Sequence, residues 1–149
     1  VLGRHLDPGR VVVTDPDRQD DGLHIALPAD PLIVPKARRL VRDRLREWDL
    51  NDSEGATLLV VSELVTNALR HGRPPLELRV ERRDEGVRVE VHDAAHESIP
   101  VVKTPPPDSV DGRGMRIVAT LAIRWGTDQV DNGKRVWAEI DGPASSLDS

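Results

Sequence analysis

Two runs of alternating apolar and charged residues, joined by a short turn, constrain the fold of this chain most. Within residues 76–82 and 87–93, apolar side chains recur at every second position. In a β-strand this spacing places the apolar side chains on one face and the charged ones on the other. The intervening Asp84-Glu85-Gly86 is rich in turn-forming residues. The sequence therefore predicts an antiparallel hairpin with one apolar and one charged face.

Other segments predict the remaining elements of the domain. Residues 24–27 alternate briefly before Pro28, and residues 123–130 and 134–140 flank the turn signal Asp131-Asn132-Gly133. Apolar residues at helical spacing predict helices over residues 34–48, 54–70 and 113–122. The run Asn51-Asp52-Ser53 supplies candidate N-cap side chains for the second helix.

The order of these elements predicts an α/β fold of the α+β type. Strand, helix, helix, strand, strand, long loop, helix, strand and strand together favour a two-layer sandwich. Its mixed, largely antiparallel sheet would carry the helices on one face. Such a sandwich leaves a groove between the helices and the sheet, where a ligand can bind.

The chain has the length of one domain, 149 residues. We expect the domain over residues 24–140, with a loosely ordered N-terminal tail at 1–23 and a C-terminal tail at 141–149. The absence of Cys and of any bilayer-length apolar run favours a soluble protein of the reducing cytoplasm. With no Phe, no Tyr and three Trp, the chain lacks the aromatic platforms on which single-stranded bases stack. We therefore expect neither a nucleic-acid nor a membrane partner.

Polar residues on the second predicted helix form a line. Glu63, Asn67 and His71 recur four residues apart among apolar neighbours, so that a carboxylate, an amide and an imidazole share one helix face. A functional site and an ordinary boundary row between core and solvent both fit this pattern.

Two further features add to this line. Asp93 ends the second alternating run, where its carboxylate could accept a hydrogen bond from an exocyclic amine. Gly112-Arg113-Gly114 comes just before a predicted helix, and the backbone N–H groups of a helix N-terminus suit a phosphate. The 19-residue segment 94–112 before it has no periodicity and suits a lid.

Together the three features resemble the ATP-binding domain of histidine kinases, gyrase and related proteins, the GHKL or Bergerat fold. Residues 63–72, with the sequence ELVTNALRHG, are similar to the N box of the bacterial anti-sigma-factor serine/threonine kinases, especially the short actinobacterial ones. Asp93 stands where that family has its adenine-reading Asp, and Gly112-Arg113-Gly114-Met115 is similar to its second glycine box. The resemblance extends from Leu27 to Ile140.

The resemblance implies a role for each matching residue. Asn67 would bind Mg²⁺ through its amide oxygen, and Glu63 would accept the proton of the attacking hydroxyl. Asp93 would read adenine. The residues expected around the ATP phosphates are Arg70, His71, Gly112, Arg113, Gly114 and Met115.

The chain departs from the family pattern at two places. Glycines that usually follow the adenine-reading Asp are replaced by Ala94-Ala95-His96. Arg135 stands where the family tends to have a Thr that assists adenine recognition.

Three functions remain open at this point. The first is an ATP- and Mg²⁺-dependent serine/threonine kinase that regulates transcription by acting on a sigma factor or on an anti-sigma-factor antagonist, and the resemblance is compatible with a homodimer. The second is a catalytically weak ATP-binding module that sequesters such a partner. The third is a zinc hydrolase using His92 and His96, which would need a helix to bring both imidazoles to one face.

Overall fold

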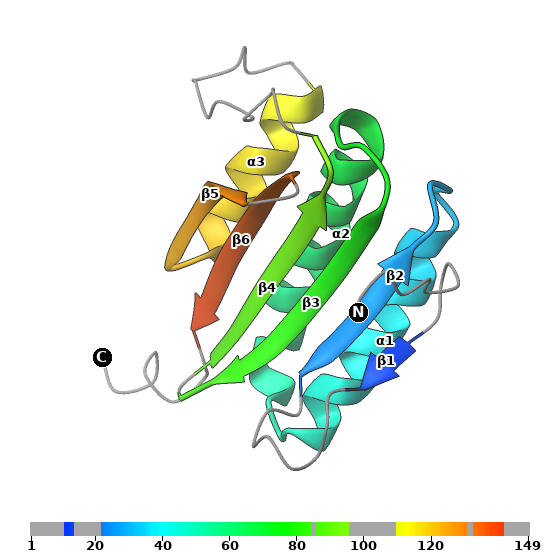
Figure 1. Cartoon of the computed structure of the whole chain (residues 1–149). Helices are drawn as coiled ribbons and strands as arrows, with labels where there is room; N and C mark the ends of the chain where they lie inside the picture. Colours follow the sequence, from blue (N-terminus) through cyan, green and yellow to red (C-terminus); the bar gives the residue numbers. More distant parts are fainter. Residues whose placement is uncertain (1–10, 14–21, 85, 96–109, 131–132, 142–149) are drawn as a thin grey trace.

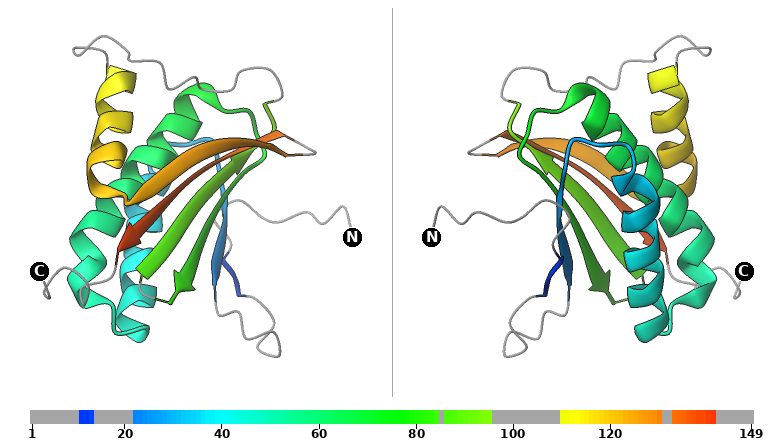
Figure 2. Two further views of the ribbon diagram at one scale, coloured as in Figure 1. Left: turned by 90° about the vertical axis from the view of Figure 1, so that its left-hand side faces the viewer. Right: turned by 90° about the vertical axis from the view of Figure 1, so that its right-hand side faces the viewer.

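The computed structural model describes residues 11–13, 22–84, 86–95, 110–130 and 133–141. These residues form a six-stranded sheet with three α-helices packed on one of its faces. The views from the two sides separate the helical layer from the sheet (Figures 1 and 2). The predicted α+β two-layer sandwich is confirmed.

The sheet is antiparallel at every neighbouring pair that the structure describes. Its strand order is β1-β2-β3-β4-β6-β5, and both predicted hairpins, β3 with β4 and β5 with β6, are present. The pairing of β4 with β6 brings the two hairpins together. The strands are β1 Val11–Val13, β2 Leu23–Leu27, β3 Leu76–Arg83, β4 Gly86–Asp93, β5 Arg124–Val130 and β6 Gly133–Asp141.

Three α-helices and one short 3₁₀ turn make the second layer. They are α1 Ile33–Glu47, the 3₁₀ turn Asn51–Ser53, α2 Glu54–His71 and α3 Val110–Leu121. The first two helices lie close to the predicted positions. The third begins at Val110 rather than at residue 113, so the glycine box lies within the first turns of α3 and not before the helix.

Ser53 occupies the N-cap position of α2, as the sequence allowed, but its side chain does not cap the helix. Asn51, Asp52 and Ser53 form the 3₁₀ turn, and no side chain caps the helix. Ser53 instead donates its hydroxyl to the backbone oxygen of Asp141 at 3.2 Å, at the end of β6. An N-cap would need the same hydroxyl oxygen to accept a hydrogen bond from a backbone N–H of the first turn, whereas here the hydroxyl is turned toward the end of β6.

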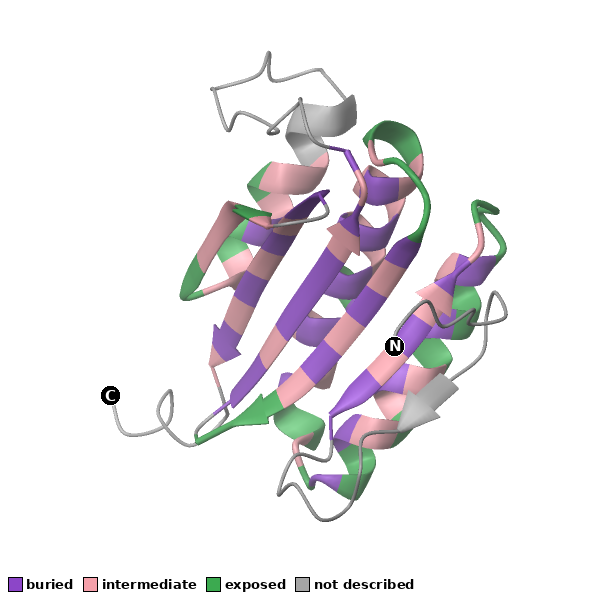
Figure 3. Cartoon of the chain, viewed as in Figure 1, coloured by how far each residue is buried: buried purple, intermediate pink, exposed green. Residues whose placement is uncertain are grey.

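The core lies between the two layers. Burial alternates along β3 and along most of β4, as the stripes in Figure 3 show. The apolar face of the hairpin therefore packs on α1 and α2, which explains the period of two in the sequence. Fully buried members of the core include Ile25, Val41, Leu45, Leu64, Leu78 and Val89.

Two of the sequence expectations fall partly outside the described residues. Within the segment expected to be a loose tail, Val11–Val13 form β1 and pair with β2, which itself begins at Leu23. The rest of residues 1–21 lies outside the described part of the chain. Most of the predicted lid, residues 96–109, also lies outside it.

Candidate functional site

The C-terminal half of α2 carries the predicted line of polar residues. Glu63 and Asn67 are half-buried and lie one helical turn apart. The buried Leu64, Val65 and Ala68 hold this part of α2 against the core. The line ends before His71, because both His71 and Arg70 are exposed in the last turn. Glu63 and Asn67 are thus partly shielded from solvent, whereas His71 lies on the surface at the end of α2.

Helix α3 approaches α2 at Glu63. A Cβ atom on Gly114 would lie 2.6 Å from Glu63 Oε1, closer than real Cβ contacts. The absence of a side chain at this position therefore makes room for the carboxylate. The structure brings the second glycine of the predicted phosphate box against the predicted base, two segments that are about fifty residues apart in the sequence.

A small cavity joins α2 to the sheet. Asn67 and Ala68 line it from α2, together with Gly72 just beyond the helix, and Asp93 lines it from the end of β4. Its volume is about 10 Å³, enough for one water molecule. Asn67 and Asp93, predicted from separate motifs, therefore border the same cavity, which is smaller than a purine in this structure.

Backbone contacts fix the position of Asp93. The N–H of Ala94 donates to Arg73 O at 2.8 Å, which ties the end of β4 to the segment after α2. A Cβ atom on Gly72 would lie 3.0 Å from Asp93 Oδ2. Gly72, identified in the sequence as a helix stop, thus also leaves space for the carboxylate. The other carboxylate oxygen, Oδ1, accepts a hydrogen bond from the N–H of Ala95 at 2.6 Å.

One residue of the cavity was missed by the sequence analysis. Lys134 lines it, is 3% exposed, and places Nζ 3.7 Å from Asp93 Oδ2. The two residues are directly opposite each other in the pairing of β4 with β6. A signal was present in the sequence, because Lys134 has the same parity as the inward-facing Val136, Ala138 and Ile140.

Gly133 brings Lys134 close to Asp93. Its φ is +154°, and a Cβ atom there would lie 1.8 Å from the backbone oxygen of Asp93. Only glycine allows this approach of two strands.

The structure places Arg135, which stands where the family tends to have a Thr, away from the cavity. Residues of β6 alternate between the two faces of the sheet, and Arg135 is opposite His92 on the face without helices. Its guanidinium pairs with Asp128 at 2.7 Å. The side chain that enters the cavity at this strand end is therefore Lys134, one residue earlier.

The remaining predicted phosphate residues lie at the start of α3. Because the helix begins at Val110, the four N–H groups without an intrahelical acceptor by position are those of residues 110–113. Gly112 and Arg113 are among them, whereas Gly114 and Met115 come after them. The side chain of Met115 is partly buried and packs against the core, so it helps to hold α3 on the sandwich.

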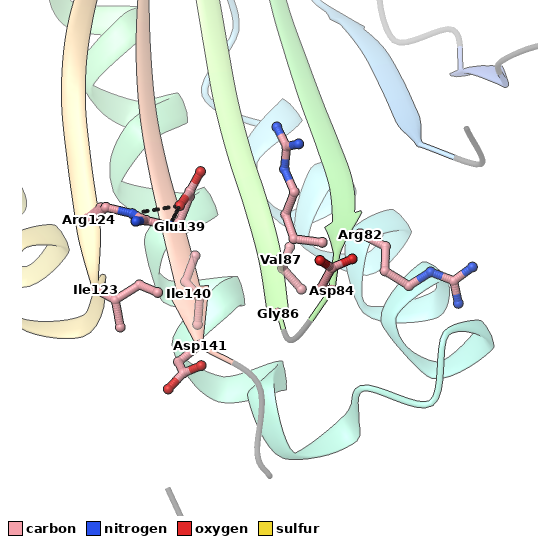
Figure 4. A pocket seen from close by; sticks show the side chains of 10 residues that line it. Arg82, Asp84, Gly86, Val87, Ile123, Arg124, Glu139, Ile140 and Asp141 are labelled. Carbon is pink, nitrogen blue, oxygen red and sulfur yellow. Dashed lines mark hydrogen bonds and ion pairs between the residues drawn. The ribbon is translucent and has the colours of Figure 1, made fainter. Parts of the chain in front are cut away.

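A larger hollow lies at the opposite end of the sheet. It has a volume of about 610 Å³ and surrounds the β3–β4 turn and the ends of β5 and β6 (Figure 4). Arg124 and Glu139 in its wall pair with each other at 2.6 Å. None of the predicted site residues lines it, and its lining holds as many acids as arginines, so size alone does not make it the functional site. Its lining residues are Arg82, Arg83, Asp84, Gly86, Val87, Ile123, Arg124, Glu139, Ile140 and Asp141.

The zinc hypothesis does not agree with the position of His92. This residue lies in β4 rather than on a helix, and its Nε2 is 2.9 Å from Glu90 Oε1. The strand turns it to the face opposite Asp93, and His96 lies outside the described residues. Within the described part of the chain, no group of three His, Cys, Asp or Glu could hold a metal ion by itself.

Comparison with known proteins agrees with the geometry of this site. In this two-layer sandwich, Asn67 of α2, Asp93 of β4 and Lys134 of β6 line one cavity, and Gly114 of α3 lies against Glu63. A family model described as the histidine kinase-like ATPase domain matches residues 27–140. The chain belongs to this family, and the GHKL resemblance found in the sequence is confirmed. It therefore carries an ATP-binding domain.

No curated protein matches the chain. Among the described residues, no helix is both long enough and apolar enough to cross a membrane.

Proposed function

We propose that this chain is an ATP- and Mg²⁺-dependent serine/threonine protein kinase of the anti-sigma-factor type. Its protein partner would be a sigma factor, an antagonist that carries the phosphorylated hydroxyl, or both, in the cytoplasm. The observation that carries the proposal is the contact of Glu63 with Gly114 one turn from Asn67, which itself borders the cavity of Asp93. Base, metal-binding amide, phosphate box and adenine-reading acid would then follow one another along one cleft.

Each residue has a defined part in phosphoryl transfer. The attacking hydroxyl oxygen forms a bond to the γ-phosphorus while the bond to the β–γ bridging oxygen breaks, and ADP leaves. Glu63 accepts the hydroxyl proton. The free N–H groups at the start of α3, with Gly112 and Arg113, would hold phosphate oxygens. The exposed side chains of Arg70 and His71 lie at the rim, where they would reach the triphosphate from α2.

The donor set near Asn67 fits Mg²⁺. This ion prefers oxygen ligands and keeps several waters, so it needs few protein ligands when a triphosphate is present. Asn67 would supply the amide oxygen, and the carboxylate of Glu63, four residues away, stays available as the base. When bound, the ion would neutralise charge on the phosphate oxygens.

The base assignment is tested by Glu63→Gln. We expect the variant to bind ATP with nearly unchanged affinity and to transfer labelled γ-phosphate to a serine-containing antagonist at least about 100-fold more slowly, the usual range for loss of a general base. Glu54→Gln, at the opposite end of α2, is the matched control and should keep wild-type transfer. Equal transfer by wild type and Glu63→Gln would reject Glu63 as the base.

A second function is favoured by one observation. The cavity beside Asp93 is smaller than a purine, and the residues after Asp93 are Ala94 and Ala95 rather than glycines. Both features suit a module that binds ATP, transfers phosphate slowly and sequesters a sigma factor. Under this alternative, wild type and Glu63→Gln would both retain a sigma factor on a column, and neither would transfer phosphate to an antagonist.

A further inference from the structure

Lys134 is a buried cation at the nucleotide cavity. Its side chain is 4% exposed and that of Asp93 is 2% exposed. Burying an ammonium group costs free energy unless it is paired. The pair with Asp93 at 3.7 Å lowers that cost, but apolar side chains would fill the same space without it. A buried lysine at the wall of a cavity that Asp93 also lines is placed to act on a ligand there.

The two side chains present complementary hydrogen-bonding groups to the cavity. Asp93 Oδ1 accepts from Ala95 N, so Oδ2 is the oxygen that faces Lys134. Carboxylate oxygens accept hydrogen bonds and ammonium groups donate three. When a ligand enters the cavity, one of these three N–H groups can turn to an acceptor on the ligand.

We propose that Lys134 is a specificity-determining residue of the nucleotide site, which reads a ring nitrogen of the purine while Asp93 reads the neighbouring exocyclic amine. This inference rests on the proposed ATP binding at Asp93. The adenine amine is a donor with ring-nitrogen acceptors on either side. An acceptor and a donor 3.7 Å apart match that pattern of donor and acceptor.

The small cavity sets a condition on this contact. With a volume of about 10 Å³, the cavity admits a purine only when side chains at its wall move. Lys134 is suited to this because its four-carbon stem is flexible, whereas the backbone around Asp93 is fixed by Gly133 and Arg73. The ammonium therefore shifts with the entering base, and Asp93 stays in place.

Calorimetry with three nucleotides tests the contact. We compare ATP with 1-deaza-ATP and 7-deaza-ATP, each of which lacks one ring-nitrogen acceptor. Wild type should bind one of the two analogues roughly 10- to 100-fold more weakly than ATP, as expected for loss of a hydrogen bond to a charged group. In Lys134→Met, ATP should bind more weakly and that difference should fall to less than about threefold. Lys36→Met, on the exposed side of α1, is the matched control.

Several outcomes overturn the inference. If wild type binds ATP and both analogues alike, or if Lys134→Met keeps the full difference, then Lys134 does not contact the base, although the ATP-binding proposal survives. Absence of ATP binding by wild type and Lys36→Met, with folding confirmed by circular dichroism, would remove both proposals. Should Lys134→Met not fold, Lys134→Arg keeps a cation beside Asp93 while moving its donors, and an unchanged preference among the nucleotides would contradict the contact.

Discussion

Gly114 and Gly55 both lie in helices, but only Gly114 lies against a residue of the candidate site. Gly114 of α3 faces Glu63, and a Cβ atom there would lie 2.6 Å from Oε1. Gly55 of α2 has nothing within 4 Å of the same position. Alanine is favoured over glycine in a helix by about 1 kcal/mol. The two substitutions therefore have the same helical gain and differ in their contacts.

We expect Gly55→Ala to raise the free energy of unfolding by about 0.5–1 kcal/mol and to leave ATP binding and phosphate transfer unchanged. Gly114→Ala should change stability little, because the carboxylate can shift, but it should slow phosphate transfer about tenfold or more by displacing Glu63. Urea denaturation and a labelled-phosphate assay measure both effects. Loss of transfer in Gly55→Ala, or wild-type transfer in Gly114→Ala, would contradict this account.

On the sheet face without helices, Glu90 is held ionised by its neighbours. Burial opposes its ionisation, but the hydrogen bond with His92, followed by the hydrogen bond and charge of Arg88, outweighs that effect and lowers the pKa of Glu90 from 4.5 to about 2. Arg88 also pairs with Glu139 at 2.9 Å and lies 4.3 Å from the centre of the Trp137 ring.

The lowered pKa of Glu90 predicts a loss of stability in acid. Since the unfolded chain takes up the proton at higher pH, this contribution is complete above about pH 4.5 and is lost as the pH falls towards 2. Over this range, Glu90→Gln should reduce the pH slope of the unfolding free energy by up to about 1.4 kcal/mol per pH unit. The control is Glu81→Gln. Glu81 lies in the neighbouring strand β3, on the same face of the sheet as Glu90, and pairs with Arg83. Identical slopes in wild type and Glu90→Gln would rule out the shift.

At the scale of elements, the helices stay in place through one buried face each. Along α1 the buried residues are Ile33, Ala37, Val41 and Leu45, a stripe at helical spacing that packs toward α2 and β2. Leu32 directly before α1 is 76% exposed, whereas Leu45 is fully buried. Comparing substitutions at these two leucines therefore shows how much tertiary packing of α1 contributes to the free energy of unfolding.

Leu45→Ala should therefore lower the free energy of unfolding by roughly 2–5 kcal/mol, because it removes buried methyl groups and leaves a cavity. Leu32→Ala should change it by less than about 0.5 kcal/mol. Chemical denaturation of both variants gives the comparison. Similar losses in the two would mean that α1 does not pack as described.

At the scale of the whole molecule, the site depends on the assembled sandwich. Its residues come from α2, α3, β4 and β6, which meet only in the folded chain. A ligand that binds there selects the folded state and raises its stability by mass action. Nucleotide binding should therefore be detectable as a stability change of the entire domain.

With ATP and Mg²⁺ at about 100 times the dissociation constant, we expect the free energy of unfolding to rise by about 2.7 kcal/mol. Removal of Mg²⁺ by a chelator should reduce this rise if Asn67 and the triphosphate share the ion. Asp93→Asn should bind less nucleotide and show a smaller rise than the exposed control Asp43→Asn. Thermal or urea unfolding with and without ligand measures these changes. If the ligand raises the unfolding free energy of Asp93→Asn as much as that of Asp43→Asn, Asp93 is not part of the site.

Much of the element pattern follows from local periodicity. The alternation of residues 76–82 and 87–93 predicted β3 and β4 because one face of the sheet is buried. The helix boundary at Val110 and the 3₁₀ turn at Asn51–Ser53 were not predicted. Their positions depend on tertiary contacts, as the hydrogen bond from Ser53 to Asp141 demonstrates.

The candidate site likewise depends partly on sequence motifs and partly on tertiary contacts. The sequence by itself determined most of the elements and the family, and it singled out Glu63, Asn67, Asp93 and the glycine box as candidates, because these patterns depend on spacing within one segment. Only the tertiary structure decided that Lys134 rather than Arg135 enters the cavity and that Gly114 borders Glu63. Those contacts join segments distant in the chain, where the pairing register of β6 with β4 and the packing of α3 on α2 set the distances.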